Sequence, residues 1–168
     1  MTIRDAVVAD IPAIFKLEHR REFDTFIGRW TENQHETAMR DIDFCYLVME
    51  GDSGGVMGYA ILRGVRSEDK SVELKRIVVD APGQGLGKML LRFVARRVFE
   101  EWEAHRLWLD VYETNPRAKW VYTEFGFQVE GVMRESSFRN GEYHSQVLMS
   151  LLDREYEALH RAAKTDGA

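Results

Sequence analysis

A glycine-rich turn between an apolar strand and a long amphipathic helix constrains the fold more than any other feature. The apolar run 77–79 enters a turn that contains Gly83, Gly85 and Gly87. Beyond the turn, apolar residues recur every four positions and predict a helix with one buried face. They are Leu86, Leu90, Val94, Val98 and Trp102. A further apolar run at 107–111 completes a strand–helix–strand unit, which predicts two parallel neighbouring strands.

The rest of the chain predicts strands that are mostly antiparallel to one another. Short apolar runs separated by turn residues mark these strands. They cover about residues 3–4, 44–50, 56–65, 71–79, 127–132 and 143–152. Further helices are expected at about 10–23, with Asp10 as N-cap, and at 33–40, 115–125 and 153–163. The fold class is therefore α/β, a mixed, mostly antiparallel sheet of six to seven strands with a central parallel pair and helices on both faces.

Composition indicates a single domain over residues 1–168, with a core at about 2–153 and a C-terminal helix and tail at 153–168. The chain is 45% hydrophobic and 30% charged, and it has no repeat or linker. No apolar run approaches the roughly 20 residues that span a bilayer, and the N-terminus does not resemble a signal peptide. Cys45 is the only cysteine, which excludes an intrachain disulfide. We therefore expect a cytoplasmic protein without a membrane partner.

The net charge of −5 disfavours nucleic acid as a partner, because phosphate binding needs a basic surface. Between Glu18 and Asp52, nine acidic residues stand against four basic ones. This segment is either a solvated face or a source of negative potential that attracts a cationic substrate. The five histidines are scattered, and no group of ligands has the spacing of a metal site, so no metal is expected.

The glycine turn has the chemistry of a phosphate cradle. Glycine lets a bulky anion approach main-chain N–H groups, and a helix N-terminus adds unpaired donors. A P-loop requires G-x-x-x-x-G-K-S/T, but Gly87-Lys88 is followed by Met89. The dinucleotide fingerprint G-x-G-x-x-G fails as well, because these glycines are two residues apart. From this segment alone, a turn that merely reverses the chain is equally acceptable.

Two motifs together resemble those of the GNAT superfamily of N-acetyltransferases. Gly85 and Gly87 match the end of the coenzyme A-binding pattern R/Q-x-x-G-x-G/A, although Pro82 replaces its first residue. The segment 115–127 resembles the family's N-x-x-A-x-x-x-Y-x-x-x-G-F at all five fixed positions. The closing hairpin, about 130–151, is similar to that of polyamine and ribosomal-protein acetyltransferases. The resemblance covers about residues 2–153.

The resemblance implies that acetyl-CoA is the cosubstrate. It places the pyrophosphate on the main-chain amides of Gly83, Gln84, Gly85, Leu86, Gly87 and Lys88. It also implies that the strand residues Ile77, Val78 and Val79 pair with the pantetheine arm as an added strand would. Asn115 contacts the same arm in the family, and its position before Pro116 makes it a natural N-cap as well.

Two residues are the predicted catalytic groups. Tyr122 occupies the position of the family's tyrosine that protonates the coenzyme thiolate, and the alternative is simple packing within its helix. An alkyl amine has a pKa of roughly 10, so a general base is expected. Glu73 is our candidate for that base, since several members of the superfamily place a glutamate near this point, and the alternative is an ion pair with Lys75. Glu113 and His144 are the reserve candidates.

The predicted function is transfer of an acetyl group from acetyl-CoA to a primary amine of a small molecule or a protein, by direct attack in a ternary complex. The alternative is a non-catalytic regulatory module that binds acyl-CoA. The closing hairpin favours polyamine or ribosomal-protein acceptors, while amino sugars and antibiotics stay open, as does a homodimer. The aromatic segment 23–30 either lies over the acceptor site or simply connects two helices.

Overall fold

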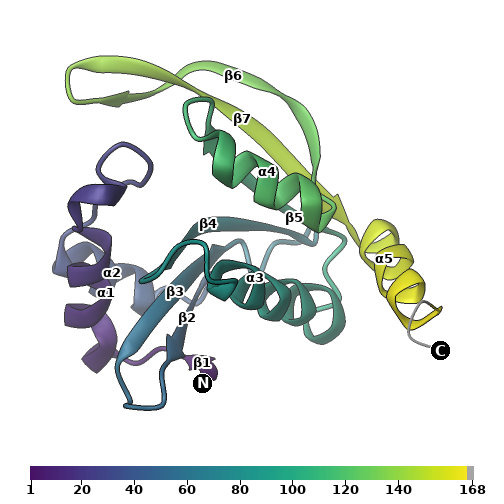
Figure 1. The fold of residues 1–168 in the computed structure, drawn as a ribbon, viewed down its shortest axis with the longest axis horizontal. Helices are drawn as coiled ribbons and strands as arrows, with labels where there is room; N and C mark the ends of the chain where they lie inside the picture. Colours follow the sequence, from purple (N-terminus) through teal and green to yellow (C-terminus); the bar gives the residue numbers. More distant parts are fainter. Residues whose placement is uncertain (166–168) are drawn as a thin grey trace.

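The computed structural model describes residues 1–165 and contains one seven-stranded sheet (Figure 1). The strands are β1 (Thr2–Asp5), β2 (Phe44–Glu50), β3 (Val56–Arg63), β4 (Ser71–Val79), β5 (Arg106–Tyr112), β6 (Gln128–Arg139) and β7 (Glu142–Leu152). Their order in the sheet is β1-β2-β3-β4-β5-β7-β6, and β4 and β5 are the one parallel pair. The predicted mixed sheet with a parallel pair is therefore confirmed.

Within residues 1–165, five α-helices accompany the sheet. They are α1 (Ile11–Glu18), α2 (Glu32–Arg40), α3 (Leu86–Arg96), α4 (Pro116–Phe125) and α5 (Asp153–Thr165). A π-helical turn, Arg97–Glu101, extends α3, as the long amphipathic pattern predicts. Among the helices in residues 1–165, none is long and apolar enough to cross a membrane.

The first helix differs from its prediction at both ends. It ends at Glu18 instead of near Phe23, and a separate 3-10 turn follows. Asp10 does not cap α1 with its side chain. Its carboxylate instead accepts a hydrogen bond from the Val7 N–H at 2.8 Å and binds Arg4 at 2.8 Å. The side chain thus ties β1 to the turn that precedes the helix.

Side chains that alternate along the strands build a core on each face of the sheet. Leu47 of β2 and Leu62 of β3 are fully buried among the side chains of α3. Their neighbours Val48 and Ile61 are fully buried against α1 and α2 on the other face. Helices therefore cover both faces, as predicted.

The parallel pair separates after only three residues. β4 and β5 are paired over Ser71–Glu73 and Arg106–Trp108, whereas β4 continues to Val79 and β5 to Tyr112. The register of β4 against β3 also shifts, because Leu62 faces Leu74 while Ile61 faces Arg76. The result is an opening between the second halves of β4 and β5, where main-chain groups of β4 have no strand partner on that side.

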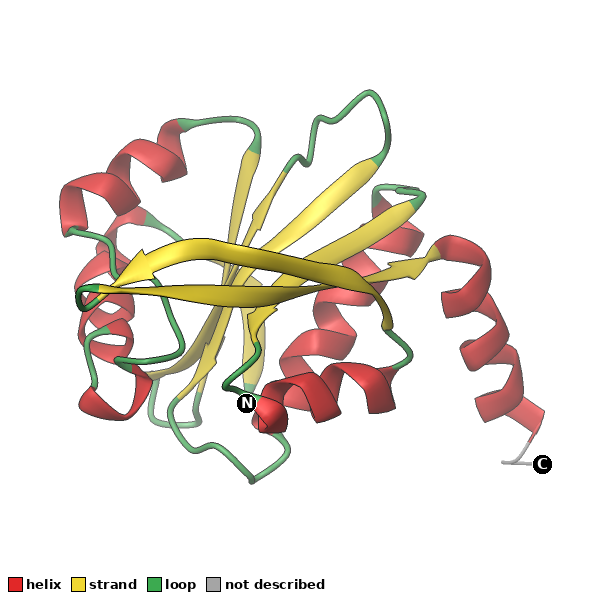
Figure 2. Cartoon of the chain, turned by 90° about the horizontal axis from the view of Figure 1, so that it is seen from above, coloured by secondary structure: helices red, strands yellow, loops and turns green. Residues whose placement is uncertain are grey.

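The hairpin of β6 and β7 extends well beyond the other strands and crosses their ends (Figure 2). Its tip reaches the segment between α1 and α2 (Figure 1). Arg139, near this tip, donates a hydrogen bond to the main-chain carbonyl of Ile27. This contact joins residues 112 positions apart in the sequence. It holds the hairpin over the opening on the α1 face.

Candidate active site

A cavity of about 240 Å³ lies beside the opening, on the face that carries α1. It is enclosed by β4, β5, the β6–β7 hairpin and the segment 26–28. The polar lining includes Lys75, Arg76, Asp110, Ser136, Arg139 and Gln146. The predicted aromatic segment 23–30 therefore does contribute to a cavity next to the opening.

Asp110 is the acidic side chain of this cavity. It alternates along β5 with the core residues Leu109 and Val111, so it points to the opposite face. Burial, followed by the nearby charge of Glu73, raises the pKa of Asp110 above its usual range. Gln146 donates a hydrogen bond to Asp110 and in turn accepts one from Ser136 at 2.8 Å, which fixes the carboxylate's orientation.

Glu73, the predicted base, lies on the same face of the sheet as Asp110. It pairs across β4 and β5 with Trp108, two residues before Asp110. Its side chain is 5% exposed and is held between two cations. Arg63 Nη2 lies 2.6 Å from Oε2, and Lys75 Nζ lies 3.6 Å from Oε1. The ion pair with Lys75 that we weighed against the catalytic role is thus present, together with a shorter one to Arg63.

Tyr122 approaches the opening from the other face of the sheet. Its ring packs beside Phe127, with centroids 5.8 Å apart, at the edge of the α3-side core. Burial, followed by the charge of Asp110, raises the pKa of Tyr122, so the phenol stays protonated at neutral pH. The hydroxyl makes no hydrogen bond to another described residue, which leaves it able to donate to a substrate.

The glycine turn forms the N-terminus of α3. Gly83 and Gly85 have φ angles of 96° and 82°, a left-handed backbone that favours glycine. Gly85 is the N-cap, so the N–H groups of the first turn, including that of Lys88, have no partner within the helix. Lys88 lies over the ring of Trp120, with Nζ 5.0 Å from its centroid, and links the start of α3 to α4.

Sequence reasoning missed Arg117 as a candidate at this turn. A Cβ atom placed on Gly83 would lie 2.9 Å from Arg117 Nη2. The guanidinium therefore lies directly beside the glycine turn, where a phosphate would be bound. Its neighbour Asn115 caps α4 and accepts a hydrogen bond from the Ala118 N–H at 3.1 Å, as the sequence predicts.

Neither of the reserve bases, Glu113 and His144, is among the residues that line the cavity. Glu113 is exposed, and the ring of His144 is 5.9 Å from that of Tyr112. Asp110, by contrast, was not among the sequence candidates. The available signal was a lone carboxylate at 110 within the apolar strand run 107–111.

Most acids of the stretch Glu18–Asp52 are paired within the described residues. Six of the nine form ion pairs, with Arg76, Arg20, Arg29, Arg40, Arg4 and the N-terminal amine. Asp43 instead accepts hydrogen bonds from the Gly64 and Arg66 N–H groups at 3.1 Å. Glu32, Asp41 and Asp43 form no ion pair within the described residues, so part of the negative charge of this stretch is left uncompensated.

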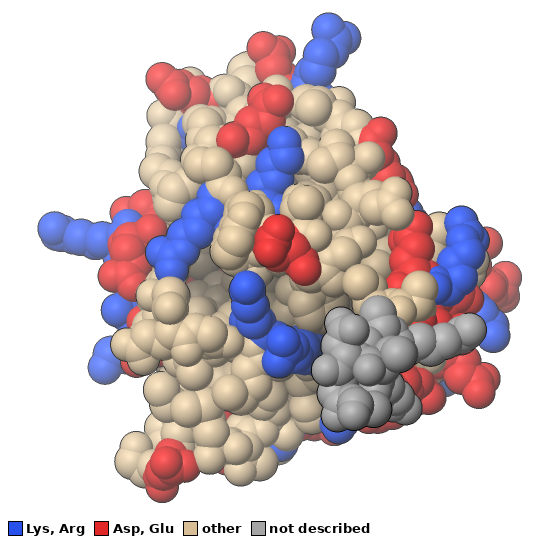
Figure 3. Space-filling view, turned by 45° about the vertical axis from the view of Figure 1, so that its right-hand side comes forward, with Lys and Arg blue, Asp and Glu red and all other residues tan. Residues whose placement is uncertain are grey.

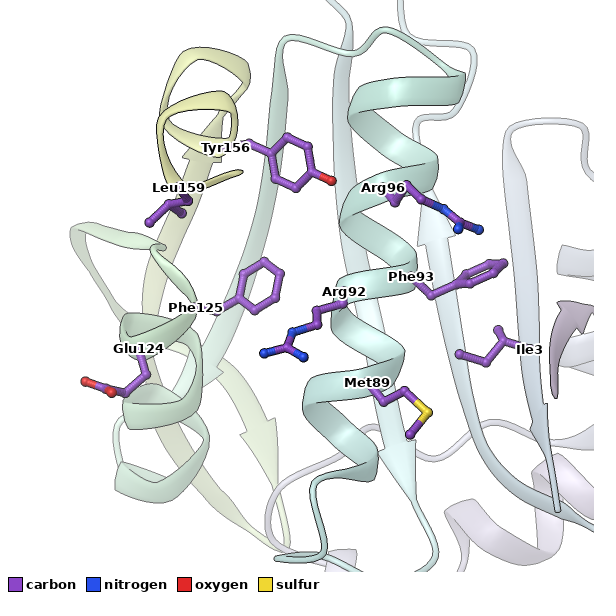
Figure 4. A pocket seen from close by; sticks show the side chains of 9 residues that line it. All are labelled: Ile3, Met89, Arg92, Phe93, Arg96, Glu124, Phe125, Tyr156 and Leu159. Atoms are coloured by element: carbon purple, nitrogen blue, oxygen red, sulfur yellow. The ribbon is translucent and has the colours of Figure 1, made fainter. Parts of the chain in front are cut away.

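A larger hollow of about 480 Å³ lies on the outer side of α3, α4 and α5 (Figure 4). Its lining is mostly apolar and includes Met89, Phe93, Phe125, Tyr156 and Leu159, with Arg92 and Arg96 beside them. Lys and Arg side chains also border a hollow on the face in Figure 3. Asp110 lines the smaller cavity and not the larger hollow, and Tyr122 lines neither, so the smaller cavity is the candidate active site.

The glycine turn and the Asn115–Phe127 motif both lie within a match to a known protein family. The sequence matches the Acetyltransferase (GNAT) family over residues 11–127, more than half of the chain. The chain belongs to the GNAT family. The family resemblance predicted from the motifs is confirmed.

Individual GNAT relatives include acetyltransferases of polyamines. An N-acetyltransferase of Mycobacterium tuberculosis is 33% identical over 93 residues, which are 54% of this chain and 56% of that protein. The chain thus matches little more than half of that relative's length. The spermidine N(1)-acetyltransferase of Vibrio cholerae is 26% identical over 140 residues, covering 83% of this chain and 78% of that protein.

Solved structures agree on the fold. The spermidine N-acetyltransferase of Vibrio cholerae in complex with CoA and spermine matches with a TM-score of 0.81 at 25% identity. The match covers 92% of this GNAT chain and 96% of that structure. The arrangement of sheet and helices is therefore that of a GNAT acetyltransferase.

Proposed function

We propose that this protein is an acetyl-CoA-dependent N-acetyltransferase that acetylates a primary amine by direct attack in a ternary complex. The observation that carries the proposal is the cavity beside the β4–β5 opening, which Asp110 lines, together with the effect of the Asp110 charge on the Tyr122 phenol. Asp110 is a carboxylate with a raised pKa, and Tyr122 is a phenol held in its protonated form. Amide formation from a thioester needs this pair of a base and an acid.

The two faces of the sheet receive the two substrates. We place the pyrophosphate of acetyl-CoA at the N–H groups of Gly83 to Lys88, with Arg117 as a cationic contact. The pantetheine arm then runs along Ile77, Val78 and Val79 into the opening, past Asn115. A main-chain N–H of this strand polarises the thioester carbonyl. The acceptor amine enters from the opposite face, through the cavity that Asp110 lines.

In the proposed mechanism, Asp110 and Tyr122 carry out the proton transfers of the reaction. Asp110 takes a proton from the ammonium form of the acceptor, and the neutral amine then attacks the thioester carbonyl. When the tetrahedral intermediate collapses, the C–S bond breaks and Tyr122 donates its proton to the departing thiolate. The amide nitrogen loses its remaining extra proton to solvent or back through the same pair.

We assign the base to Asp110 and a positioning role to Glu73. The carboxylate of Glu73 is occupied by Arg63 and Lys75, whereas Asp110 faces the cavity. The negative charge of Glu73 contributes to the raised pKa of Asp110. A carboxylate with a raised pKa is the stronger base.

A non-catalytic acyl-CoA-binding module is the alternative. Such a module would use the glycine turn but has no need for a base and an acid at the opening. The deciding experiment measures release of free thiol from acetyl-CoA with a panel of primary amines. Because relatives of this chain include spermidine and spermine N(1)-acetyltransferases, spermidine and spermine are the first acceptors in the panel. Turnover that requires both Asp110 and Tyr122 supports the enzyme, and coenzyme binding without turnover on any amine supports the module.

A further inference from the structure

Two guanidinium groups meet at Gly28 in the acceptor cavity. A Cβ atom placed on Gly28 would lie 2.8 Å from Arg76 Nη2 and 3.0 Å from Arg139 Nη2. Both nitrogens therefore lie near the same point. The distance between them is no larger than the sum of these two distances. A side chain at Gly28 would therefore crowd both guanidinium groups, which also line the cavity of about 240 Å³.

The surroundings hold both arginines in place without neutralising both of them. Arg76 is buried, with Nη1 2.7 Å from Glu18 Oε2 and its guanidinium carbon 4.8 Å from the Trp30 ring centroid. Arg139 forms no ion pair with a carboxylate of the described residues. Its guanidinium lies over the Tyr112 ring at 5.5 Å and donates to a main-chain carbonyl.

Two cations at one partly buried point repel each other unless an anion lies between them. Lys75 also lines the cavity but is paired with Glu73 at 3.6 Å, and Arg76 is paired with Glu18, so Arg139 is the lining cation that has no carboxylate partner among the described residues. Planar guanidinium groups bind carboxylates through paired, charge-assisted hydrogen bonds, which are stronger than neutral ones. The Nη2 atoms at Gly28 thus form a site for one carboxylate.

We propose that the acceptor is a compact primary amine that also carries a carboxylate. Its amine lies at Asp110, and its carboxylate lies between Arg76 and Arg139. This inference rests on the proposed function, since the amine is placed by the base. It separates the protein from polyamine acetyltransferases, because a polyamine would bring a second ammonium group to the guanidinium groups of Arg76 and Arg139.

Matched acceptors test the charge preference directly. We would compare glycine, β-alanine and γ-aminobutyrate, each with its own amide, and include putrescine as the dication. We expect kcat/KM to be roughly 10- to 100-fold higher for the best acid than for its amide, the range of charged hydrogen bonds. The amide has the less basic amine, so such a preference cannot arise from a larger fraction of neutral amine.

Two variants locate the preference in the cavity. Arg139→Gln removes the unpaired cation, and Gly28→Ala fills the volume between the guanidinium groups while keeping both charges. Each should reduce the acid-over-amide ratio toward one. Arg134→Gln is the matched control, because it removes the same charge from an exposed position on the same hairpin and should leave the ratio unchanged.

Calorimetry with CoA-loaded protein reads the anion site without turnover. The best-bound acid should bind the wild type and Arg134→Gln, and its affinity should fall at least tenfold in Arg139→Gln. Equal binding by the wild type and Arg139→Gln, or no binding of any of the three acids, overturns the proposal. A preference for putrescine overturns it as well, while leaving the proposed acetyl transfer intact. Failure of acetyl transfer itself would appear as binding without thiol release.

Discussion

The carboxylate of Asp110, on the α1 side of the sheet, adds to burial in raising the pKa of the Tyr122 phenol, which packs at the α3-side core. This relationship depends on the early separation of the two strands after Glu73 and Trp108. A continuously paired sheet would keep the two side chains apart. In the proposed mechanism, the acceptor amine enters from the α1 side of this opening and the thioester from the α3 side.

Replacing Tyr122 by phenylalanine should lower kcat by about 10²- to 10⁴-fold, because one proton donor to the thiolate is lost. The ring that packs on Phe127 remains, so the free energy of unfolding should change little. Affinity for acetyl-CoA, measured by calorimetry, should be nearly unaffected. Wild-type kcat in this variant would assign the proton to another group.

Replacing Asp110 by asparagine should lower kcat/KM by about 10²- to 10⁴-fold and yet not destabilise the protein at neutral pH. The folded-state pKa of Asp110 is raised, so its contribution to stability is present below the unfolded-state pKa and is lost as pH rises through the folded-state pKa. Removing the charge should thus raise the urea midpoint at pH 7. This gain should vanish below about pH 4, where the carboxyl is protonated in both states. A loss of stability at pH 7 would contradict the burial of a costly charge.

Replacing Glu73 by glutamine distinguishes a positioning residue from the base. Removing the negative charge should lower the pKa of Asp110, because that charge helps to raise it. The acidic limb of the kcat/KM profile should then move to lower pH, with substantial activity retained. If Glu73 itself is the base, the variant should lose activity at every pH and Asp110→Asn should retain it.

Replacing Arg117 by glutamine should weaken binding of CoA by roughly tenfold and reduce the salt dependence of that binding. Gly85→Glu should abolish binding, because φ at this position is left-handed and a carboxylate would repel the phosphates. Lys119→Gln, at an exposed position two residues further along α4, is the matched control. Equal affinities for all four proteins would remove the pyrophosphate from the glycine turn.

The sequence predicted the parts of the molecule that follow from local pattern. The bounds of the strands at Phe44–Glu50 and Ser71–Val79 agree with the structure, since a short apolar run between turn residues defines each of them. The glycine turn and the Asn115 cap were also predicted, because φ preferences and capping are local properties.

The remaining features depend on tertiary contacts that local pattern does not contain. Helix α1 ends at Glu18, whose buried carboxylate binds a residue on β4 far along the chain. Arg139 becomes part of the cavity only because the β6–β7 hairpin crosses to Ile27. In the sequence, Asp110 is only a carboxylate within an apolar strand, and its position beside the opening is visible only in the structure. Charge pairing at the acidic stretch likewise required the positions of distant arginines.

The last prediction concerns Glu18, which is fully buried at the centre of a polar cluster behind the acceptor cavity. It binds Arg76 Nη1 at 2.7 Å and accepts hydrogen bonds from the Tyr59 hydroxyl at 2.7 Å and the Trp30 N–H at 2.5 Å. Burial acts to raise its pKa, but a hydrogen bond from His35 and the charge of Arg76, with smaller contributions, outweigh burial and lower it.

Glu18→Ala should therefore reduce the free energy of unfolding by about 3–5 kcal/mol, because it leaves the buried guanidinium of Arg76 without a partner. Glu36→Ala, which removes an exposed partner of Arg40, should change it by no more than about 0.5 kcal/mol. Because the folded-state pKa of Glu18 is lowered, its stabilisation is present above the unfolded-state pKa and is lost as pH falls through the folded-state pKa. The difference between wild type and Glu18→Ala, measured by urea unfolding, should consequently shrink in acid. A difference that stays constant from neutral to strongly acidic pH would mean that packing, and not the ion pair, explains the loss.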